Sequence, residues 1–327
     1  MGAGKRPRVH GFSIWGVNFM HLAKAPGKRR FRLTKRVRDN FNAYLFLLPT
    51  LILFCAFTIY PFFNAFYIAL CQWDGLTDIQ FIGLANYINL FLNDDVFFIA
   101  WKNTLLFAVI SGPISFFASF IMAWLISNLK KLRNVFSLAF YAPSITSGVA
   151  MSTVWLYFFS SDSYGLINNV LIRMGLISEP IKWTLDPQYI LGVVVFISIW
   201  MGMGTGFLTF LAGLQGLNEE IYEAGMIDGI RNSVQELFYL TLPQMKPQLL
   251  FGAINGTVAA FGVFDIAVSV AGMPSPNYAA HTIVAHLYDY AFIRFDMGYA
   301  SAVAVILFLM TFVLGRVFMK VFSSKDQ

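Results

Sequence analysis

Residues 190–214 read ILGVVVFISIWMGMGTGFLTFLAGL, a stretch without one charged side chain. A membrane-spanning helix needs about 20 consecutive, mostly apolar residues to cross a hydrocarbon core of about 30 Å. Backbone groups in lipid must be satisfied within a helix or within a closed barrel. Because the stretch is too long and too continuously apolar for a barrel strand, it predicts a transmembrane helix.

Five further stretches have the same character. They are residues 43–66, 100–126, 135–159, 249–271 and 299–321. The composition agrees, since 57% of the chain is hydrophobic and only 12% is charged, whereas soluble domains carry about 25% charged residues. The sequence therefore predicts an all-α membrane protein with six transmembrane helices.

The orientation of the spans follows from the basic residues. Most of the 23 Lys and Arg residues fall on one side of this arrangement. The exceptions are Lys102, Arg173, Lys182 and Arg294. Because basic loops stay in the cytoplasm, both termini and the segment between spans four and five are predicted to be cytoplasmic. The net charge of +6 then attracts membrane lipid and is no nucleic-acid footprint.

The same reasoning divides the chain into domains. A basic cytoplasmic segment is expected over residues 1–40, a six-span domain over 41–321 and a short cytoplasmic tail over 322–327. On the outer side, apolar positions at helical spacing predict an amphipathic helix over 166–174. The outer segments are either solvated connectors or a docking surface for an external partner, and the sequence leaves both interpretations open.

The cytoplasmic segment over 218–247 has an unusual pattern. Asn218, followed by two glutamates, is a good helix start, because its side chain can cap an orphan amide. Gly229 is expected to break this helix, Pro243 to end a second one, and Pro247 to start the fifth span. The segment is net acidic, so an anionic lipid surface would repel it. We therefore expect a soluble protein partner here.

Particular residues of this segment resemble a known family. Glu223-Ala224-Gly225, Asp228-Gly229 and Leu242-Pro243 are similar to the E-A-A loop of permease subunits in binding-protein-dependent ABC importers, with Gly225 where Ala is usual. Asn103, Tyr141-Ala142-Pro143 and Gly213-Leu214-Gln215 resemble the carbohydrate-uptake type. The resemblance covers nearly everything from about residue 41 onward.

The resemblance implies a function and a set of partners. The loop over 223–243 would couple two ATP-binding subunits to a sugar or oligosaccharide permease of the inner membrane that works by alternating access. A second homologous permease and an external solute-binding protein are implied as well. This chain has no G-x-x-x-x-G-K-[ST] motif, so ATP and Mg would reside on the partner subunits and the chain would not be an enzyme. The implied coupling residues are Glu223, Ala224, Gly225, Asp228, Gly229, Leu242 and Pro243.

Sugar recognition calls for aromatic faces and hydrogen-bonding side chains, and polar residues inside spans are costly and often functional. The candidate substrate-path residues are Ser198, Trp200, Gly202, Thr205, Asn255, Phe261, Phe264 and Asp265. The fifth-span members are expected to share a helix face. Helix packing is an equally good interpretation of Asp265, the acid inside that apolar run.

Other functions remain possible from sequence alone. An ion-coupled secondary transporter would need several intramembrane ionisable groups and paired broken helices, for which the spans offer little beyond Asp265. A membrane metalloenzyme is disfavoured because His281 and His286 have no matching acid and Cys set in the sequence. An ABC importer of a phosphorylated polyol is a further alternative.

Overall fold

The computed structural model describes residues 35–129 and 131–323, with side chains described for 44–129 and 131–320. The chain falls into two compact units that divide after Phe57. Most of the basic segment predicted over 1–40 and most of the tail over 322–327 lie outside the described residues. Within the first unit, the described chain is helix α1 (Lys35–Phe54), which leads into the π-helical turn η1 (Cys55–Ile59).

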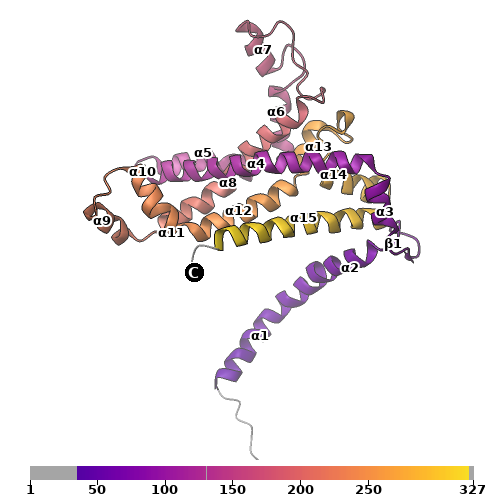
Figure 1. Cartoon of the computed structure of the whole chain (residues 1–327), viewed down its shortest axis with the longest axis horizontal. Coiled ribbons are helices and arrows are strands. Elements are labelled where there is room, and N and C mark those ends of the chain that lie inside the picture. Colours follow the sequence, from indigo (N-terminus) through magenta and orange to yellow (C-terminus); the bar gives the residue numbers. More distant parts are fainter. Residues whose placement is uncertain (1–34, 130, 324–327) are drawn as a thin grey trace, which may run out of the picture. The chain divides into compact units, whose positions relative to one another are not determined.

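The second unit contains the remaining elements, drawn from indigo to yellow in Figure 1. Its first elements are α2 (Tyr60–Ile68), β1 (Cys71–Gln72), β2 (Gln80–Phe81), α3 (Ala85–Leu92), α4 (Asp95–Ser127), α5 (Arg133–Ile145), α6 (Gly148–Phe158), α7 (Leu166–Arg173) and α8 (Ile190–Gln215). They are followed by α9 (Glu219–Ile227), α10 (Ser233–Glu236), η2 (Leu237–Thr241), α11 (Leu242–Gln244), α12 (Lys246–Phe261), α13 (Asp265–Ala271), η3 (Pro276–Tyr278), α14 (Ile283–Tyr288), η4 (Asp289–Ile293) and α15 (Met297–Ser323).

The membrane spans agree in part with the prediction. Among the described residues, five helices are long and apolar enough to cross a membrane, or six if one bent pair counts as a single span. The five are Tyr44–Ile68, Asp95–Ser127, Ile190–Gln215, Lys246–Ala271 and Met297–Lys320. The chain is thus an all-α membrane protein with five to six spans.

The third span, predicted over 135–159, is not a single straight helix. Helices α5 and α6 meet at an angle of 98°, and Thr146 between them has an extended backbone. The cause is local. Pro143 lacks an amide donor, and the hydroxyls of Ser144 and Thr146 donate to the carbonyls of Tyr141 and Ala142. The last turn of α5 is therefore weakened from within.

The fifth span is also interrupted, where a continuous helix over 249–271 was expected. Helix α12 ends at Phe261 and α13 begins at Asp265. The break frees the carbonyl of Val263, which accepts a hydrogen bond from the Thr282 hydroxyl at 3.0 Å. A backbone group released inside the fold has thus found a partner, as buried polar groups must.

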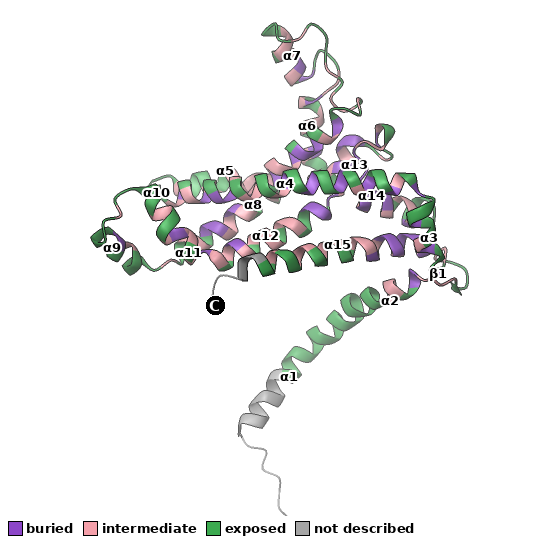
Figure 2. Cartoon of the chain, in the orientation of Figure 1, coloured by how far each residue is buried: buried purple, intermediate pink, exposed green. Residues whose placement is uncertain are grey.

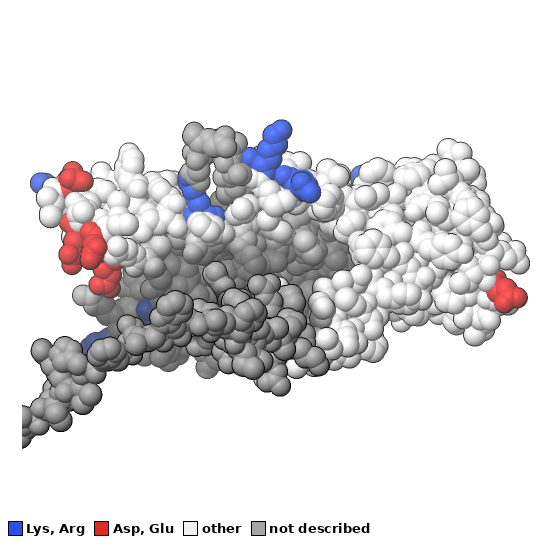
Figure 3. All heavy atoms as spheres, turned by 90° about the horizontal axis from the view of Figure 1, so that it is seen from below, with Lys and Arg blue, Asp and Glu red and all other residues white. Residues whose placement is uncertain are grey.

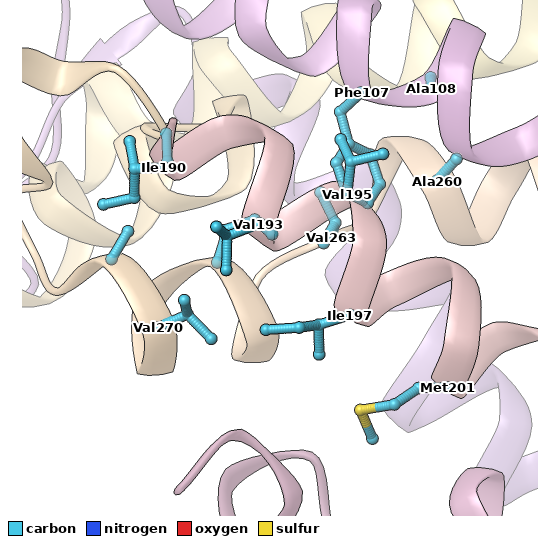
Figure 4. Packing of buried hydrophobic residues seen from close by; sticks show 14 of the residues in the cluster. Phe107, Ala108, Ile190, Val193, Val195, Ile197, Met201, Ala260, Val263 and Val270 are labelled. Carbon is cyan, nitrogen blue, oxygen red and sulfur yellow. The ribbon is translucent and has the colours of Figure 1, made fainter. Parts of the chain in front are cut away.

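The long helices form the body of the second unit. Helix α4 packs along α8 and α12, and α12 also packs along α15. Figure 2 shows buried residues concentrated on the inward faces of these helices. The largest apolar cluster joins α4, α8, α12 and α13, and Figure 4 shows its Val and Ile side chains meeting between the ribbons.

Small residues let α8 approach its neighbours closely. A Cβ atom placed on Gly204 would lie 2.6 Å from Ser144 Oγ, and one on Gly206 would lie 2.8 Å from Ser119 Oγ. The Ser119 hydroxyl donates to the carbonyl of Met203 at 2.9 Å. Such small-residue contacts and interhelical hydrogen bonds are a main source of helix association in membranes.

The segment between α6 and α8 is organised around one asparagine. The Asn168 amide nitrogen donates to the carbonyls of Ser160, Asp162 and Ile181, at 2.9–3.1 Å. Its oxygen accepts from the Ile181 amide and from the Trp183 indole N–H. Asn168 is fully buried. The amphipathic helix predicted over 166–174 is confirmed as α7, but its buried anchor is this polar residue.

We predict that Asn168→Ala disorders the segment between α6 and α8 while the long helices stay packed. The change leaves buried carbonyl and N–H groups without partners, which costs about 1–3 kcal/mol per group. Hydrogen exchange of the purified chain should show faster exchange confined to residues 160–188. Asn169→Ala is the matched control, because the neighbouring amide makes one exposed hydrogen bond of 3.4 Å. Unchanged exchange in Asn168→Ala would contradict the assigned role.

Candidate functional site

The acidic loop between α8 and α12 forms a small protruding unit. The Asn218 side chain accepts from the Glu220 amide, which confirms the predicted helix start. Gly229 has a φ of +96°, so it ends α9 in a conformation that other residues adopt at a cost. Gly225 is buried, and a Cβ there would lie 2.7 Å from Leu240 Cδ1. The small residue at this position allows α9 to rest on the second helix of the loop.

One detail of the predicted loop is wrong. Pro243 does not end the second helix, because α10, η2 and α11 continue through it to Gln244. The π-helical turn η2 lies just before Pro243 and accommodates the proline within the helix. The Leu242 amide donates a hydrogen bond to the carbonyl of Leu237, five residues back. A π-helical bulge is a common way to accommodate a disturbed helix. The Lys246 helix start with Pro247 in its first turn is as expected.

The tip of the loop combines acids with exposed apolar side chains. Glu223 and Asp228 are exposed, and Figure 3 shows acidic side chains gathered at the end of the molecule where α9 and α10 lie. Met226 and Ile227 are 65% and 87% exposed. Exposed apolar residues rimmed by charges are typical of protein interfaces. The sequence interpretation overlooked Met226 and Ile227, although they lie within the motif.

A cavity of about 600 Å³ opens among α4, α8, α12 and α13. Of the predicted substrate-path residues, it is lined by Ser198, Gly202, Thr205, Asn255, Phe264 and Asp265. The other two predictions do not reach it. Phe261 is 2% exposed within the apolar cluster, and Trp200 packs on Trp155 with ring centroids 5.2 Å apart. The expected common face of α12 therefore fails at Phe261, which points into the core instead.

Asp265 lies at the first turn of α13, directly after the break in the fifth span. Its side chain is exposed at the cavity wall. Gly148 of α6 comes so close that a Cβ there would lie 3.6 Å from Asp265 Cβ. Peptide dipoles make the start of a helix a favourable place for a carboxylate. Asp265 thus lies where α13, after the break in the fifth span, meets α6, after the bend in the third span.

A row of hydroxyls on α4 also lines the cavity, and the sequence interpretation missed it. Ser111, Ser115 and Ser119 occur at intervals of four residues, so they share one helix face. Ser144 of α5 and Thr209 of α8 add further hydroxyls. The four-residue spacing was readable in the sequence. Without knowing which face of α4 turned inward, it could not be told from ordinary small-residue packing.

A second polar cluster lies at the opposite end of the molecule from α9. The Asp94 carboxylate accepts from the Phe97 amide at 2.9 Å and from the Tyr299 hydroxyl at 2.6 Å. Its Oδ2 also lies 3.1 Å from His286 Nε2 and accepts from the Tyr290 hydroxyl at 3.1 Å. His286 thus has an acid partner in Asp94, a pairing that the sequence interpretation did not include. Among the described residues, however, no group of three or more His, Cys, Asp or Glu could hold a metal ion.

This cluster ties together three elements distant in sequence, α4, α14 with η4, and α15. Asn103 of α4 extends the connection, since its amide donates to the carbonyls of Tyr278 and His281 at 2.8 and 3.0 Å. Burial raises the pKa of Asp94, yet the hydrogen bonds from His286, Tyr299 and the Phe97 amide outweigh it and hold this pKa well below its ordinary value. The carboxylate therefore stays charged in the folded chain.

We predict that His281 makes the fold sensitive to mild acid. Burial, aided by the neighbouring His286, lowers the pKa of His281 from 6.5 to about 4. The unfolded chain binds a proton that the folded chain does not bind. The contribution of His281 to the free energy of unfolding is therefore constant above pH 6.5 and falls between about pH 6.5 and 4. The loss amounts to about 3 kcal/mol. Asp94 acts in a lower pH range, because its pKa in the folded chain is lowered. Its contribution to stability is fully present above its ordinary pKa of 3.8 and is lost only as the pH falls below that value.

The measurement is the thermal denaturation midpoint of the purified chain between pH 8 and 4. His281→Gln should flatten the decline between pH 6.5 and 4, because glutamine does not titrate. Equal acid sensitivity of the two proteins would contradict the assignment.

Comparisons with known proteins agree with this architecture. Residues 115–325 match the family described as binding-protein-dependent transport system inner membrane component. The lactose transport system permease protein LacF of Rhizobium radiobacter is 31% identical over 297 residues, which cover 90% of this chain and 97% of that protein. The arabinooligosaccharides transport system permease protein AraP of Bacillus subtilis is 29% identical over 308 residues, covering 92% and 94%.

The fold has a solved counterpart as well. A chain in the crystal structure of a bacterial ABC transporter involved in the import of the acidic polysaccharide alginate superposes with a TM-score of 0.77, at 22% sequence identity. The match covers 90% of this chain and 99% of the other. The spans thus form an ABC permease fold, a multi-pass inner-membrane component that is not itself an enzyme. The chain belongs to the family of inner membrane components of binding-protein-dependent transport systems.

Proposed function

We propose that this chain is the permease subunit that moves a neutral sugar or oligosaccharide across the inner membrane by alternating access. The cavity among α4, α8, α12 and α13 carries the proposal. Its described lining offers serine and threonine hydroxyls, the Asn255 amide, the Asp265 carboxylate and several Phe rings, but no Lys or Arg. Hydroxyls, an amide and aromatic faces suit a polyhydroxylated solute.

The charge of the same lining separates the candidate substrates. A phosphorylated polyol or an acidic sugar would bring a negative charge to a wall whose charged member is Asp265. Like charges at close range repel each other. The cavity therefore favours an uncharged substrate, in line with the sugars named for LacF and AraP.

The α9–α11 loop would supply the coupling to ATP. In the proposed complex, two ATP-binding subunits with ATP and Mg dock on this loop from the cytoplasm, with both termini on the same side. Coupling would rest on Glu223, Ala224, Gly225, Asp228, Gly229, Leu242 and Pro243. A second, homologous permease would close the central cavity, and an external binding protein would deliver the sugar. The exposed charges of α9 and the exposed Met226 and Ile227 support a protein partner at this loop.

Reconstituted uptake tests the proposal. The complex that co-purifies with this chain is placed in proteoliposomes with its binding protein, and uptake of radiolabelled lactose, an arabinooligosaccharide and glycerol 3-phosphate is measured. ATP-dependent uptake of a neutral sugar that survives dissipation of ion gradients would support the proposal. Uptake driven by an ion gradient would indicate a secondary transporter, and uptake of glycerol 3-phosphate alone would overturn the substrate class.

We predict that Asp265→Ala lowers uptake about tenfold or more while the complex still assembles. The carboxylate would make charge-assisted hydrogen bonds to sugar hydroxyls, worth about 1.5–3 kcal/mol. Assembly is monitored by size-exclusion chromatography. Asp78→Asn is the control, because Asp78 is an exposed acid of the β1–β2 connection, away from the cavity lining. Unchanged uptake in Asp265→Ala would reduce Asp265 to a helix-packing residue.

A further inference from the structure

A second cavity, of about 500 Å³, lies where the α9–α11 loop meets the long helices. It is lined by Trp124, Ser127, Asn128, Arg133, Leu214, Gln215, Leu217, Glu219, Tyr222, Glu236 and Thr241. These residues come from the ends of α4 and α8, the start of α5, and the loop itself. The lining of the central cavity shares none of them. This is a separate site at the opposite end of α4 from the Asp94 cluster.

The lining contains an unmet hydrogen-bond donor. Arg133 Nη2 is buried and has no hydrogen-bond partner within the described part of the chain. A buried guanidinium nitrogen without an acceptor costs free energy, and each such atom in a folded protein calls for an explanation. An oxygen atom of a bound molecule would satisfy it. The amides of Asn128 and Gln215 and the hydroxyl of Ser127 line the same space with further donors and acceptors.

The mixture of charges selects the kind of molecule. Glu219 and Glu236 would repel a phosphate or carboxylate, and Arg133 would repel a cation such as a polyamine. A neutral polyol, by contrast, can donate to carboxylates and accept from a guanidinium at once. Trp124 and Tyr222 add the aromatic faces on which the apolar side of a sugar ring packs. We propose that this cavity binds a neutral sugar from the cytoplasm.

The position of the cavity gives the bound sugar a role. Tyr222 of α9 is hydrogen-bonded to Thr241 of η2 at 3.0 Å, and both line the cavity. A sugar there would bridge this loop pair to Arg133 on α5 and Asn128 at the end of α4. It would thus fasten the α9–α11 loop to the helices that it has to move. Imported sugar accumulating in the cytoplasm would slow further import through this site.

Equilibrium binding tests the site without transport. The assembled importer in lipid nanodiscs, without binding protein or ATP, is titrated with radiolabelled lactose, sucrose and raffinose, and with glucose 6-phosphate and spermidine for comparison. At least one neutral sugar should bind, and the two charged probes should bind at least tenfold more weakly. Failure of all three neutral sugars, or preference for a charged probe, would overturn the proposal.

Variants place the binding in the second cavity. Arg133→Met should weaken sugar binding at least tenfold, and Arg231→Met, at an exposed arginine that lines neither cavity, should leave it unchanged. Unchanged binding in Arg133→Met would place the sugar outside the second cavity and overturn the inference. Should Arg133→Met fail to assemble, Ser127→Phe, which fills the second cavity, provides the same test.

ATP hydrolysis gives the functional readout. With saturating loaded binding protein, the neutral sugar that binds should lower hydrolysis at least twofold in the wild type and leave it unchanged in Ser127→Phe. Equal response of both proteins would exclude the regulatory role. The choice of a sugar rests on the proposed function, but the two fail separately. Sugar binding without ATP-driven uptake would refute the transport proposal alone, and uptake without binding in the second cavity would refute this one alone.

Discussion

Glu223→Ala is expected to release the proposed ATP-binding subunits from the purified complex while the permease itself stays folded. Glu223 is exposed on α9, next to Met226 and Ile227, so a docked subunit would cover it. Truncating one partner of a buried, hydrogen-bonded charge pair costs about 2–5 kcal/mol or more. This corresponds to an association about 30-fold to 4,000-fold weaker. The measurement is the ratio of ATPase to permease after a mild-detergent pull-down.

The chain offers a matched control on the same helix. Glu220→Ala removes the same charge one turn earlier, near the Asn218 cap rather than at the tip of the loop. We expect Glu220→Ala to keep most of its ATPase. Equal losses in the two variants would mean that the net acidity of the loop matters and Glu223 has no specific role. Normal co-purification in Glu223→Ala would remove it from the coupling interface.

A backbone variant tests the same interface without changing a native charge. Gly229 holds a φ of +96° at the corner after α9. Left-handed backbone costs most other residues about 1–2 kcal/mol, so Gly229→Ala should reorient α9 and weaken docking. Gly216→Ala is the comparison, because Gly216 ends α8 with an ordinary φ of −90°. If both glycine variants keep their ATPase equally, the shape of the corner does not determine docking.

Local features of the chain were predictable because their causes lie within a few residues. The helix start at Asn218 and the turn at Gly229 follow from the capping side chain and from the freedom of glycine. The apolar stretches gave the long spans α4, α8 and α15. The 98° bend after Pro143 also has a local cause, but a proline in a membrane helix often leaves the helix continuous.

The central cavity was predictable only in part. Polar residues on α8, α12 and α13 were recognised because hydroxyl, amide and carboxylate groups stand out in an apolar run. Phe261 and Trp200 could not be assigned, since aromatic side chains serve the core and a substrate path equally well. The serine row on α4 needed knowledge of which face turned inward, and that is decided by packing against α8 and α12.

The Asp94 cluster was out of reach for a different reason. Asp94 and His286 are 192 residues apart and Asp94 and Tyr299 are 205 apart. No spacing rule connects residues at such a separation. Their meeting depends on α4, α14 and α15 converging at the same end of the molecule, which only the completed fold brings about. In the sequence, Asp94 appeared as one acid among several in an outer segment.

Asp94→Ala is accordingly expected to destabilise the fold strongly. Removing the carboxylate leaves the hydroxyls of Tyr290 and Tyr299, the His286 ring and the Phe97 amide without their acceptor. Breaking a buried, hydrogen-bonded charge cluster in this way costs about 3–5 kcal/mol. The variant should therefore yield little folded protein, with a clearly lowered denaturation midpoint.

Asp95→Ala separates the role of the cluster from that of a negative charge at the helix start. Asp95 is the neighbouring acid in the first turn of α4, and its side chain is exposed. Its removal should cost about 0.3–1 kcal/mol, the value of a charge at a helix terminus. Asp94→Asn should fall between the two, since the amide keeps one oxygen as an acceptor. If Asp94→Ala and Asp95→Ala denature at the same temperature, the hydrogen-bonded cluster adds nothing beyond helix capping. A clear gap between the two denaturation midpoints would mean that the Asp94 cluster holds α4, α14 and α15 together as one unit, against which the α9–α11 loop could act at the other end.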